Sequence, residues 1–338
     1  MKKIQGLFSL IIMMLVINPI LADINSFMVI TASNAANSNE LLIYNDSGKL
    51  LQNLPTQGKG GVAPNIIGGG IAKMQDFITV INYGSQSVSL FKKQGDRFQL
   101  VKVIPSLSKP VSLAFGHNHL YILGETTIES HKMDGGMIAD RPDGSSRLLV
   151  GDGSAAQVGV LKNQLIFSER SHTIGLVDLR DGIVTDSIQP VQLPPAPKND
   201  TPVGLATKGD TAYVTIAHSD EVGLVKNGKL VKVLSSETQH APCWLTLMGS
   251  WLFCSNTPSK SISRYNASAN DLTLAKLIAV QTQGEPSDID AEDQMLGALE
   301  RGGSQTRLTL FQADNEGNFT FVNSFITAPT ANGIAIIK

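Results

Sequence analysis

Three stretches of this chain share one pattern without gaps: PVSLA at 110–114 with LYI at 120–122, PVGLA at 202–206 with AYV at 212–214, and PCWLT at 242–246 with LFC at 252–254. In each stretch the residue after the proline lies eleven positions before the last residue of the second triplet. Polar or glycine-containing tips at 116–119, 208–210 and 248–250 join the two apolar arms. Such arms and tips are typical of β-hairpins, so each stretch is interpreted as one copy of a repeated hairpin.

Weaker copies of the hairpin fill much of the remaining chain, at 69–80, 156–167 and 286–297. A further apolar strand follows the hairpin in most copies, as in VGLV at 222–225. A turn of the Asn-Gly type and a fourth strand come next, as in NGKL at 227–230. Four short strands per repeat, without helical periodicity, indicate the blades of a β-propeller.

The two ends of the chain supply one more blade. Residues 27–31 and 41–44 have the pattern of the later strands of a blade that lacks its first strand. Residues 332–337 have the pattern of a first strand with nothing after it. Joining the ends adds a composite blade to six complete repeats. The sequence therefore predicts an all-β, seven-bladed propeller whose ring is closed by N- and C-terminal strands sharing one blade, so that no sheet edge stays open there.

The N-terminus has the pattern of a secretory signal peptide. Lys2 and Lys3 precede an apolar run at 7–17, and Ala22 precedes the polar Asp23. The run is too short to span a bilayer comfortably, although an uncleaved anchor is the alternative. We expect residues 1–22 to be removed and residues 23–338 to form a single propeller domain, exported to the periplasm or the extracellular space.

Charge excludes one class of partner. The chain has 27 Lys and Arg against 29 Asp and Glu. Removing Lys2 and Lys3 leaves 25 basic against 29 acidic residues, a net charge of −4. A weakly acidic chain without a basic run lacks the electrostatic footprint of a nucleic-acid-binding protein. No other segment is apolar enough to span a membrane.

The two cysteines fall on one predicted hairpin. If Met248 and Gly249 form its turn, Cys243 lies directly opposite Cys254 across an antiparallel pair. Such a pair, in an oxidising compartment, predicts a disulfide. Two buried free thiols are the alternative.

Several stretches resemble the seven-bladed lactonase-type propellers, the family of 6-phosphogluconolactonase and 3-carboxymuconate cyclase, and in particular its exported branch. They are NYGSQSVSLF at 82–91, AAQVG at 155–159, APCW at 241–244, ISRY at 262–265 and ANGIA at 331–335. The resemblance covers essentially the whole chain after residue 22. It implies the seven-bladed fold and chemistry on lactones. It carries no individual catalytic residue across, because the active-site motifs of these enzymes have no residue-by-residue match here.

Known catalytic and cofactor signatures are missing. Gly151, Gly153 and Ala156 imitate a dinucleotide fingerprint, but they precede a predicted strand and lack the helix that would hold a pyrophosphate. His117 and His119 have metal-ligand spacing, but they lie on a hairpin tip, where a solvated turn is the simpler interpretation. We therefore expect neither a cofactor nor a metal.

Candidate site residues come from one place in the repeat, just after the second strand of each blade. In a propeller these loops gather on one face around the mouth of the ring, the usual ligand site. The aligned positions and their neighbours are polar. They are Asn34, Asn82, Tyr83, Glu169, Arg170, His172, His218, Asn256, Glu300 and Arg301, with Arg147 as a more distant addition. An arginine there could grip an oxyanion, and Glu169 or Glu300 could move a proton if its pKa were raised.

Two functions follow as hypotheses. The first is a lactonase or lactonizing cyclase that acts without a metal on a small lactone or carboxylated cyclic substrate, with Glu169 and Glu300 as catalytic residues. The second is a non-enzymatic exported propeller that binds a small molecule, a glycan or a protein through one face. It is motivated by blades that offer only apolar residues at the mouth, such as Ile216 and Ala217. Ordinary turn chemistry could also account for the polar loops, because asparagine is common in turns.

Overall fold

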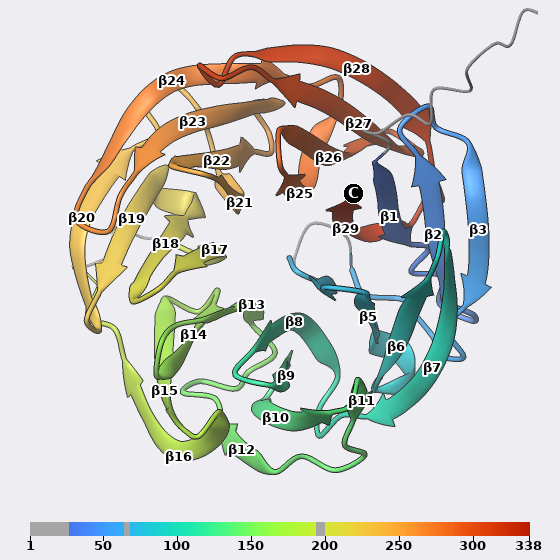
Figure 1. The fold of residues 1–338 in the computed structure, drawn as a ribbon. Helices are drawn as coiled ribbons and strands as arrows, with labels where there is room; N and C mark the ends of the chain where they lie inside the picture. The colour runs from blue at the N-terminus through green and yellow to red at the C-terminus, as the bar shows by residue number, and fades with distance from the viewer. Residues whose placement is uncertain (1–26, 64–67, 194–199) are drawn as a thin grey trace, which may run out of the picture.

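The computed structural model describes residues 27–63, 68–193 and 200–338. Seven antiparallel sheets stand around a common centre in the order of the chain (Figure 1). The seven-bladed propeller expected from the repeats is therefore confirmed. The expected signal peptide, residues 1–22, lies outside the described residues.

Each blade runs from an innermost strand near the ring centre to an outermost strand at the rim (Figure 1). Blade 1 holds β29 (Asn332–Ile337), β1 (Met28–Ala32), β2 (Glu40–Asn45) and β3 (Leu50–Pro55). Blade 2 holds β4 (Ile71–Met74), β5 (Phe77–Asn82), β6 (Ser87–Gln94) and β7 (Arg97–Pro105), and blade 3 holds β8 (Pro110–Gly116), β9 (His119–Gly124), β10 (Thr127–Asp134), β11 (Met137–Ile138) and β12 (Gly144–Arg147). Blade 4 holds β13 (Ala155–Val160), β14 (Gln164–Glu169), β15 (Thr173–Arg180) and β16 (Ile183–Pro190), and blade 5 holds β17 (Pro202–Lys208), β18 (Thr211–Ile216), β19 (Glu221–Lys226) and β20 (Lys229–Ser235). Blade 6 holds β21 (Pro242–Met248), β22 (Trp251–Asn256), β23 (Ser261–Ala267) and β24 (Leu272–Gln281), and blade 7 holds β25 (Glu285–Glu292), β26 (Met295–Gly302), β27 (Gln305–Ala313) and β28 (Phe319–Ile326).

Blade 1 is the composite blade that the sequence predicts. The last strand, β29, pairs antiparallel with the first, β1, and Val29 lies opposite Ile336. Lys73 on β4 strengthens this closure, because its Nζ lies 2.8 Å from Asp290 Oδ2, 2.8 Å from Glu292 Oε2 and 2.7 Å from the carbonyl oxygen of Ile336. One ammonium therefore ties the innermost strands of blades 1, 2 and 7 together.

A β-bulge interrupts the register near the start of the innermost strand in six of the seven blades. The shifts occur at Pro110/Ser112, Ala155/Gln157, Pro202/Leu205, Pro242/Leu245, Pro286/Asp288 and, in blade 1, opposite Thr31/Ala32. A bulge bends its strand and re-aims the side chains beside it. These bends lie at the end of each blade that carries the predicted mouth loops.

The expected disulfide is wrong, because the turn of the hairpin lies one residue later than expected. The turn of this hairpin is Gly249-Ser250, so Met248 pairs with Trp251 and Leu245 pairs with Cys254. Cys243 falls inside the bulge and its Sγ lies 3.2 Å from the carbonyl oxygen of Ala241. Both cysteines are free thiols, and burial raises the pKa of each.

Blade 3 departs from the four-strand plan. The expectation that His119 lies on a solvated hairpin tip is also wrong in this blade. Two short strands, β11 and β12, share the outer edge of β10 in this blade. His119 is buried, with Nε2 2.9 Å from Asp143 Oδ2 on the segment between them. A carboxylate that is distant in the sequence therefore partners this histidine, whereas His117 stays in the turn.

Short 3₁₀ turns follow the second strand in blades 2 and 5, at Tyr83–Ser85 and Ala217–Ser219. Within the described residues, none of the helical segments is long and apolar enough to cross a membrane.

Candidate functional site

The predicted site loops do share one end of the ring. Because neighbouring strands are antiparallel, the end of the second strand lies beside the start of the innermost strand, as Pro110 lies opposite Gly124. The loop after the second strand therefore meets the loop that leads into the innermost strand, here called the lead-in loop. Side chains that join these two loops build the mouth.

Glu169 is buried against the lead-in loop of blade 4. The side chain is fully buried at the end of β14. Its Oε1 accepts the N–H of Gly151 at 2.7 Å, and Oε2 accepts that of Val150 at 3.1 Å. These hydrogen bonds from backbone N–H groups fix the carboxylate to the loop. This geometry suits holding the loop in place better than moving a proton to a substrate.

Glu300 makes the same kind of contact in blade 7. It is fully buried, and its Oε2 accepts the N–H groups of Gln283 at 3.0 Å and Gly284 at 2.8 Å. Its Oε1 is buried without a hydrogen-bond partner. The two predicted catalytic carboxylates therefore occupy equivalent places in two blades that are far apart in the ring.

Asn82 and Asn256 form a second equivalent pair, in blades 2 and 6. The Asn82 amide donates to Ser87 and Ser89, the latter at 2.7 Å. The Asn256 amide donates in the same way to Ser261 and Ser263, the latter at 2.8 Å. Both asparagines are fully buried. Both join the second strand to the third of their blade, and the Asn82 Oδ1 also accepts the hydroxyl of Thr56, on the lead-in loop of blade 2, at 2.7 Å.

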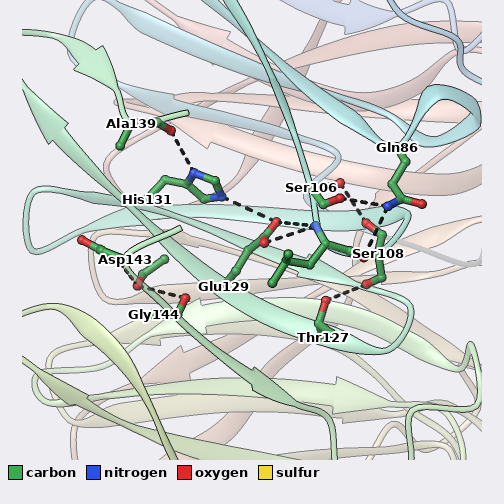
Figure 2. Close-up of polar contacts among 11 residues, drawn as sticks. Gln86, Ser106, Ser108, Thr127, Glu129, His131, Ala139, Asp143 and Gly144 are labelled. Carbon is green, nitrogen blue, oxygen red and sulfur yellow. Dashed lines mark hydrogen bonds and ion pairs between the residues drawn. The ribbon is translucent and has the colours of Figure 1, made fainter. Parts of the chain in front are cut away.

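Sequence alignment of the repeats missed the corresponding carboxylate of blade 3. Glu129 lies on β10, the third strand, and accepts the N–H of Leu107 from the lead-in loop with both oxygens at 3.2 Å. His131 is buried beside it, with Nδ1 2.9 Å from the Ala139 carbonyl oxygen and Nε2 3.6 Å from Glu129 Oε1 (Figure 2). The comparison of equivalent positions missed Glu129 because this residue lies one strand later in the blade.

Partly exposed groups of both charges gather over blade 3, from the loops of blades 2, 3 and 4. The Tyr83 hydroxyl donates to the Glu125 carboxylate, and Lys109 Nζ lies 5.0 Å from the centre of the Tyr83 ring. Burial together with Glu125 raises the pKa of Tyr83 to about 12, so its hydroxyl stays protonated at neutral pH. Arg170 interacts electrostatically with Tyr83 and Asp152. The predicted residues Tyr83 and Arg170 therefore belong to one cluster.

Arg170 is held by backbone oxygens. Its Nε and Nη2 donate to the carbonyl oxygens of Ser154 and Gly153, each at 3.3 Å. No carboxylate of the described residues lies within ion-pair distance of its guanidinium. Partial burial lowers its pKa, but an arginine stays charged at neutral pH. Arg170 therefore brings a positive charge, fixed in direction, to the mouth.

His172 follows on the same loop and forms a pair that repeat comparison did not predict. Its Nδ1 hydrogen-bonds Asp200 Oδ1, from the lead-in loop of blade 5. Asp200 has a side chain only 5% exposed, whereas that of His172 is 43% exposed. A carboxylate on Nδ1 fixes the imidazole ring, and a histidine held in this way can serve as a general base through Nε2.

Two further histidines lie on this face in blade 5 and the loop that follows it. His218 Nδ1 lies 2.9 Å from the Thr201 hydroxyl oxygen. His240, which was not predicted, has Nδ1 2.9 Å from Asp220 Oδ2. Its side chain is 67% exposed. The face therefore carries two His–Asp pairs in neighbouring positions, and only His172–Asp200 shares a loop with Arg170.

Arg301 faces the centre of the ring. It donates to the Ala331 carbonyl oxygen at 2.6 Å and interacts electrostatically with Asp288 on the innermost strand β25. Burial raises the pKa of Asp288 to about 8, although the N–H of Ile289 donates to it. Sequence reasoning missed Asp288 because it lies inside a strand, away from the loops.

Glycine residues 68–70 cross this centre. The N–H of Leu113 in blade 3 donates to the Gly69 carbonyl oxygen at 2.9 Å. A Cβ on Gly68 would lie 2.3 Å from the ring of Trp244 in blade 6. Gly69 has a φ of +68°, a conformation that glycine adopts readily. The backbone can approach Trp244 so closely only without side chains.

Arg147 lies apart from these groups. It ends β12 and pairs with Thr127, on the outer part of blade 3. It lines a hollow of about 660 Å³ together with residues of blade 4 such as Asp186 and Ile188. Across the described residues, no three His, Cys, Asp or Glu side chains are grouped so that they could hold a metal ion.

Comparison with known proteins supports the fold. The chain matches a putative 6-phosphogluconolactonase from Bacteroides uniformis with 14% identity and a TM-score of 0.67, over 92% of this chain and 99% of that one. A putative 6-phosphogluconolactonase from Bacteroides fragilis gives 13% identity and a TM-score of 0.68, over 95% and 100%. Virginiamycin B lyase from Staphylococcus aureus, in a structure with quinupristin, gives 16% identity and a TM-score of 0.57, over 77% and 84%.

The resemblance to lactonase-type propellers is thus confirmed at the level of the fold. Neither a protein-family model nor a curated protein matches the chain. At these identities the likeness to solved structures carries no residue roles.

Proposed function

We propose that this chain is a lactonase-like enzyme, exported by a signal peptide at residues 1–22, that opens a small carboxylated lactone at the mouth between blades 2 and 5 without a metal. The likeness to putative 6-phosphogluconolactonases supports the reaction class. The observation that carries the proposal is His172, oriented by Asp200, two residues from the fixed positive charge of Arg170. A base and an anion-binding group on one short loop are the minimum that lactone opening requires.

The reaction needs no group beyond these and water. His172 Nε2 takes a proton from a water molecule as the water oxygen bonds to the lactone carbonyl carbon. Arg170, with Lys109 nearby, stabilises the negative charge on the carbonyl oxygen or on a substrate carboxylate. The ring C–O bond then breaks, and the proton passes from His172 to the departing ring oxygen. The product is a hydroxy acid. Glu169 and Glu300, first expected to move the proton, are assigned here to holding loops.

Two matched histidine variants test the base. His172 has a φ of +58°, so we choose His172→Asn, because asparagine tolerates this conformation. The control is His240→Asn, which removes the other His–Asp pair of the same face. In a pH-stat assay of residues 23–338 with sugar, muconate and acyl lactones, we expect His172→Asn to lower kcat by about 100-fold or more. His240→Asn should keep the rate.

If His172→Asn keeps the lactonase rate of the wild type, the general base is a residue other than His172. The double variant Glu169→Gln, Glu300→Gln then becomes decisive, because its loss of activity with a native melting temperature would return proton transfer to these carboxylates. We expect it to retain activity at temperatures where it is folded.

The second candidate is a non-enzymatic exported propeller that binds a small molecule, a glycan or a protein through this face. It is favoured by blade 5, where the mouth position holds the apolar Ile216 and the buried Ala217. A flat pH-stat trace with every lactone, together with binding that depends on Arg170, would support this function and reject the enzyme.

A further inference from the structure

Two histidines of blade 3 are buried, each beside a carboxylate. The side chain of His119 on β9 is 5% exposed, and Asp143 faces it from the chain between β11 and β12. His131 on β10 is fully buried next to Glu129, whose side chain is 1% exposed. The proposed reaction uses neither histidine. Their hydrogen bonds indicate another role.

Both ring nitrogens of His119 lie against acceptors. Nδ1 is 2.7 Å from the carbonyl oxygen of His117, and Nε2 is 2.9 Å from Asp143 Oδ2. A carbonyl oxygen only accepts, so Nδ1 carries a hydrogen. A neutral imidazole has no second hydrogen, and its Nε2 lone pair would then face an ionised carboxylate. The contact with Asp143 is therefore a hydrogen bond only when the pair holds one additional proton, on Nε2 or on the carboxylate.

His131 repeats this arrangement on the next strand (Figure 2). Its Nδ1 lies 2.9 Å from the carbonyl oxygen of Ala139, so this nitrogen also carries the hydrogen. Its Nε2 is buried without a hydrogen-bond partner, and Glu129 Oε1 lies 3.6 Å from it. A second hydrogen on Nε2 makes a buried ion pair, whereas a lone pair there would leave two unpaired acceptors facing each other. This pair, too, is complete only with one additional proton.

The exposed pair His240–Asp220 differs in this respect. His240 Nδ1 lies 2.9 Å from Asp220 Oδ2, and its side chain is 67% exposed. Its Nε2 has no hydrogen-bond partner within the described residues, so a neutral imidazole with its hydrogen on Nδ1 satisfies the pair. The requirement for an additional proton is therefore a property of the two buried pairs.

Both buried pairs hold the chain between β11 and β12, residues 139–143, here called the β11–β12 link. The Ala139 carbonyl oxygen at its start accepts from His131, and the Asp143 carboxylate at its end meets His119. The N–H groups of Ala139 and Asp143 donate to carbonyl oxygens of β10 at 2.9 Å and 3.0 Å. The link is thus fastened to the blade at its two ends, and a histidine takes part at each end.

The other titratable groups around the two pairs are partnered or exposed. Burial and Asp143 raise the pKa of Tyr121, which stacks on His119, so its hydroxyl stays protonated and donates to Gly182. Lys102 of blade 2 pairs with Asp140 of the link at 2.9 Å. The exposed groups are His117, Lys132 opposite His119 on β10, and Arg180 and Asp181 beside Gly182 in blade 4. The two buried pairs are therefore the groups that can tie the link to a change of charge near neutral pH.

We propose that the β11–β12 link is a pH-dependent strap. It is fastened while the pairs His119–Asp143 and His131–Glu129 each hold one additional proton, and it loosens when they lose these protons. The fastening is complete at low pH and is lost as the pH rises.

The loosening extends towards the mouth through Glu129. The same carboxylate accepts the N–H of Leu107 with both oxygens at 3.2 Å. Leu107 lies on the lead-in loop of blade 3, two residues before Lys109, whose Nζ lies over the ring of Tyr83. A change at His131 therefore acts on the loop that brings Lys109 to the mouth. The strap itself does not depend on the lactonase reaction, because its protons and its exchange are measured without a substrate.

Hydrogen exchange on the intact protein follows the strap directly. Protection factors are compared, because they remove the effect of pH on the intrinsic exchange rate. For the amides of Ala139 and Asp143, we expect protection to fall by about tenfold or more between about pH 5 and about pH 8, the range in which histidine changes its charge. Amides of β22 in blade 6 should stay within about threefold over the same range. Protection of the link that does not change with pH would overturn the proposal.

The double variant Asp143→Asn, Glu129→Gln should keep the strap fastened without the protons. Each amide can donate to the bare Nε2 of its histidine while its oxygen keeps the donor that the carboxylate had, Ser130 in one case and Leu107 in the other. We expect protection of the link to change by less than about threefold over the same pH range. The matched control is Asp220→Asn, which alters the exposed pair and should respond as the wild type does.

Two results from these variants would contradict the proposal. One is a double variant that still loses protection as the pH rises, and the other is an Asp220→Asn variant that no longer responds.

Nitrogen-15 NMR of labelled histidines locates the protons. At high pH, His119 and His131 should keep their hydrogen on Nδ1 and show a bare Nε2. A His119 with its hydrogen on Nε2 and a bare Nδ1 would overturn the proposal. This measurement uses the wild type alone, so the proposal can be rejected even if the variants do not fold.

Discussion

Blades 4 and 7 carry the same dipeptide, Glu-Arg, at the same place, and use its second residue differently. Both glutamates are buried and hold a lead-in loop through backbone N–H groups. Arg170 remains at the mouth beside Tyr83, whereas Arg301 turns towards the ring centre and Asp288. The two equivalent glutamates therefore share a structural role, whereas the arginines that follow them have different surroundings.

The two glutamates should differ in their tolerance of an amide, and this is the largest effect we expect. Both oxygens of Glu169 accept N–H groups, so Glu169→Gln sets an NH₂ group against a backbone donor. Glu300 accepts with Oε2 alone, so a glutamine fits with its NH₂ at the unpartnered Oε1. We expect urea unfolding to show a loss of about 1–3 kcal/mol for Glu169→Gln and less than about 1 kcal/mol for Glu300→Gln. Equal losses would mean that the two loops are not held alike.

A second difference lies on the innermost strands, where blade 7 has Asp288 and blade 4 has Gln157 at the matching position. Because the pKa of Asp288 is about 8 in the fold and close to 3.8 unfolded, the folded chain binds the extra proton between these values. Stability linked to this group is therefore present at low pH and is lost as the pH rises towards 8.

Asp288→Asn should remove that loss. Thermal unfolding between pH 5 and pH 8 should show the variant gaining stability over the wild type as the pH rises. The control is Asp178→Asn, because hydrogen bonds from Gln164 and Ser187 lower the pKa of Asp178 and its contribution is lost only in acid. Parallel curves for Asp288→Asn and the wild type would show that Asp288 is already ionised in the fold.

The arginines should give the clearest separation of roles. Arg301→Gln removes the donor to Ala331 and should cost about 1–2 kcal/mol. Arg170→Gln should change stability by less than about 1 kcal/mol, because its two contacts are long and partly exposed. With a lactone substrate, Arg170→Gln should raise KM about tenfold and Arg301→Gln should not. The reverse result would move the site from the mouth to the ring centre.

The fold could be predicted because the hairpin pattern that produces it occurs several times in the sequence. The hairpins at 110, 202 and 242 share a proline, an apolar arm and a polar tip, and each copy confirms the others. The bulges are not visible in this pattern, because one extra residue in a strand leaves its composition unchanged. The predicted cysteine pairing failed for a different reason, because the turn is Gly249-Ser250 and not Met248-Gly249, which places Leu245 opposite Cys254.

The candidate site was predicted less completely. Alignment of equivalent loops found Arg170, Tyr83 and His172, which do lie on one face. It could not find Asp200, which lies 28 residues after His172 on a loop of another blade, or Glu129, which is displaced onto a third strand. It also could not show that Glu169 and Glu300 are buried, because their partners are N–H groups of the backbone, which every sequence offers.

The composite blade has a consequence for how the molecule is made. Strand β1 has to wait for β29, which is made only after all strands of the other six blades. Until residues 332–337 arrive, blade 1 lacks its inner strand, and Lys73 lacks the Ile336 carbonyl oxygen. A chain that lacks residues 332–337 would leave β1 as an open edge and the ring open. The ring can therefore close only after β29 has been made.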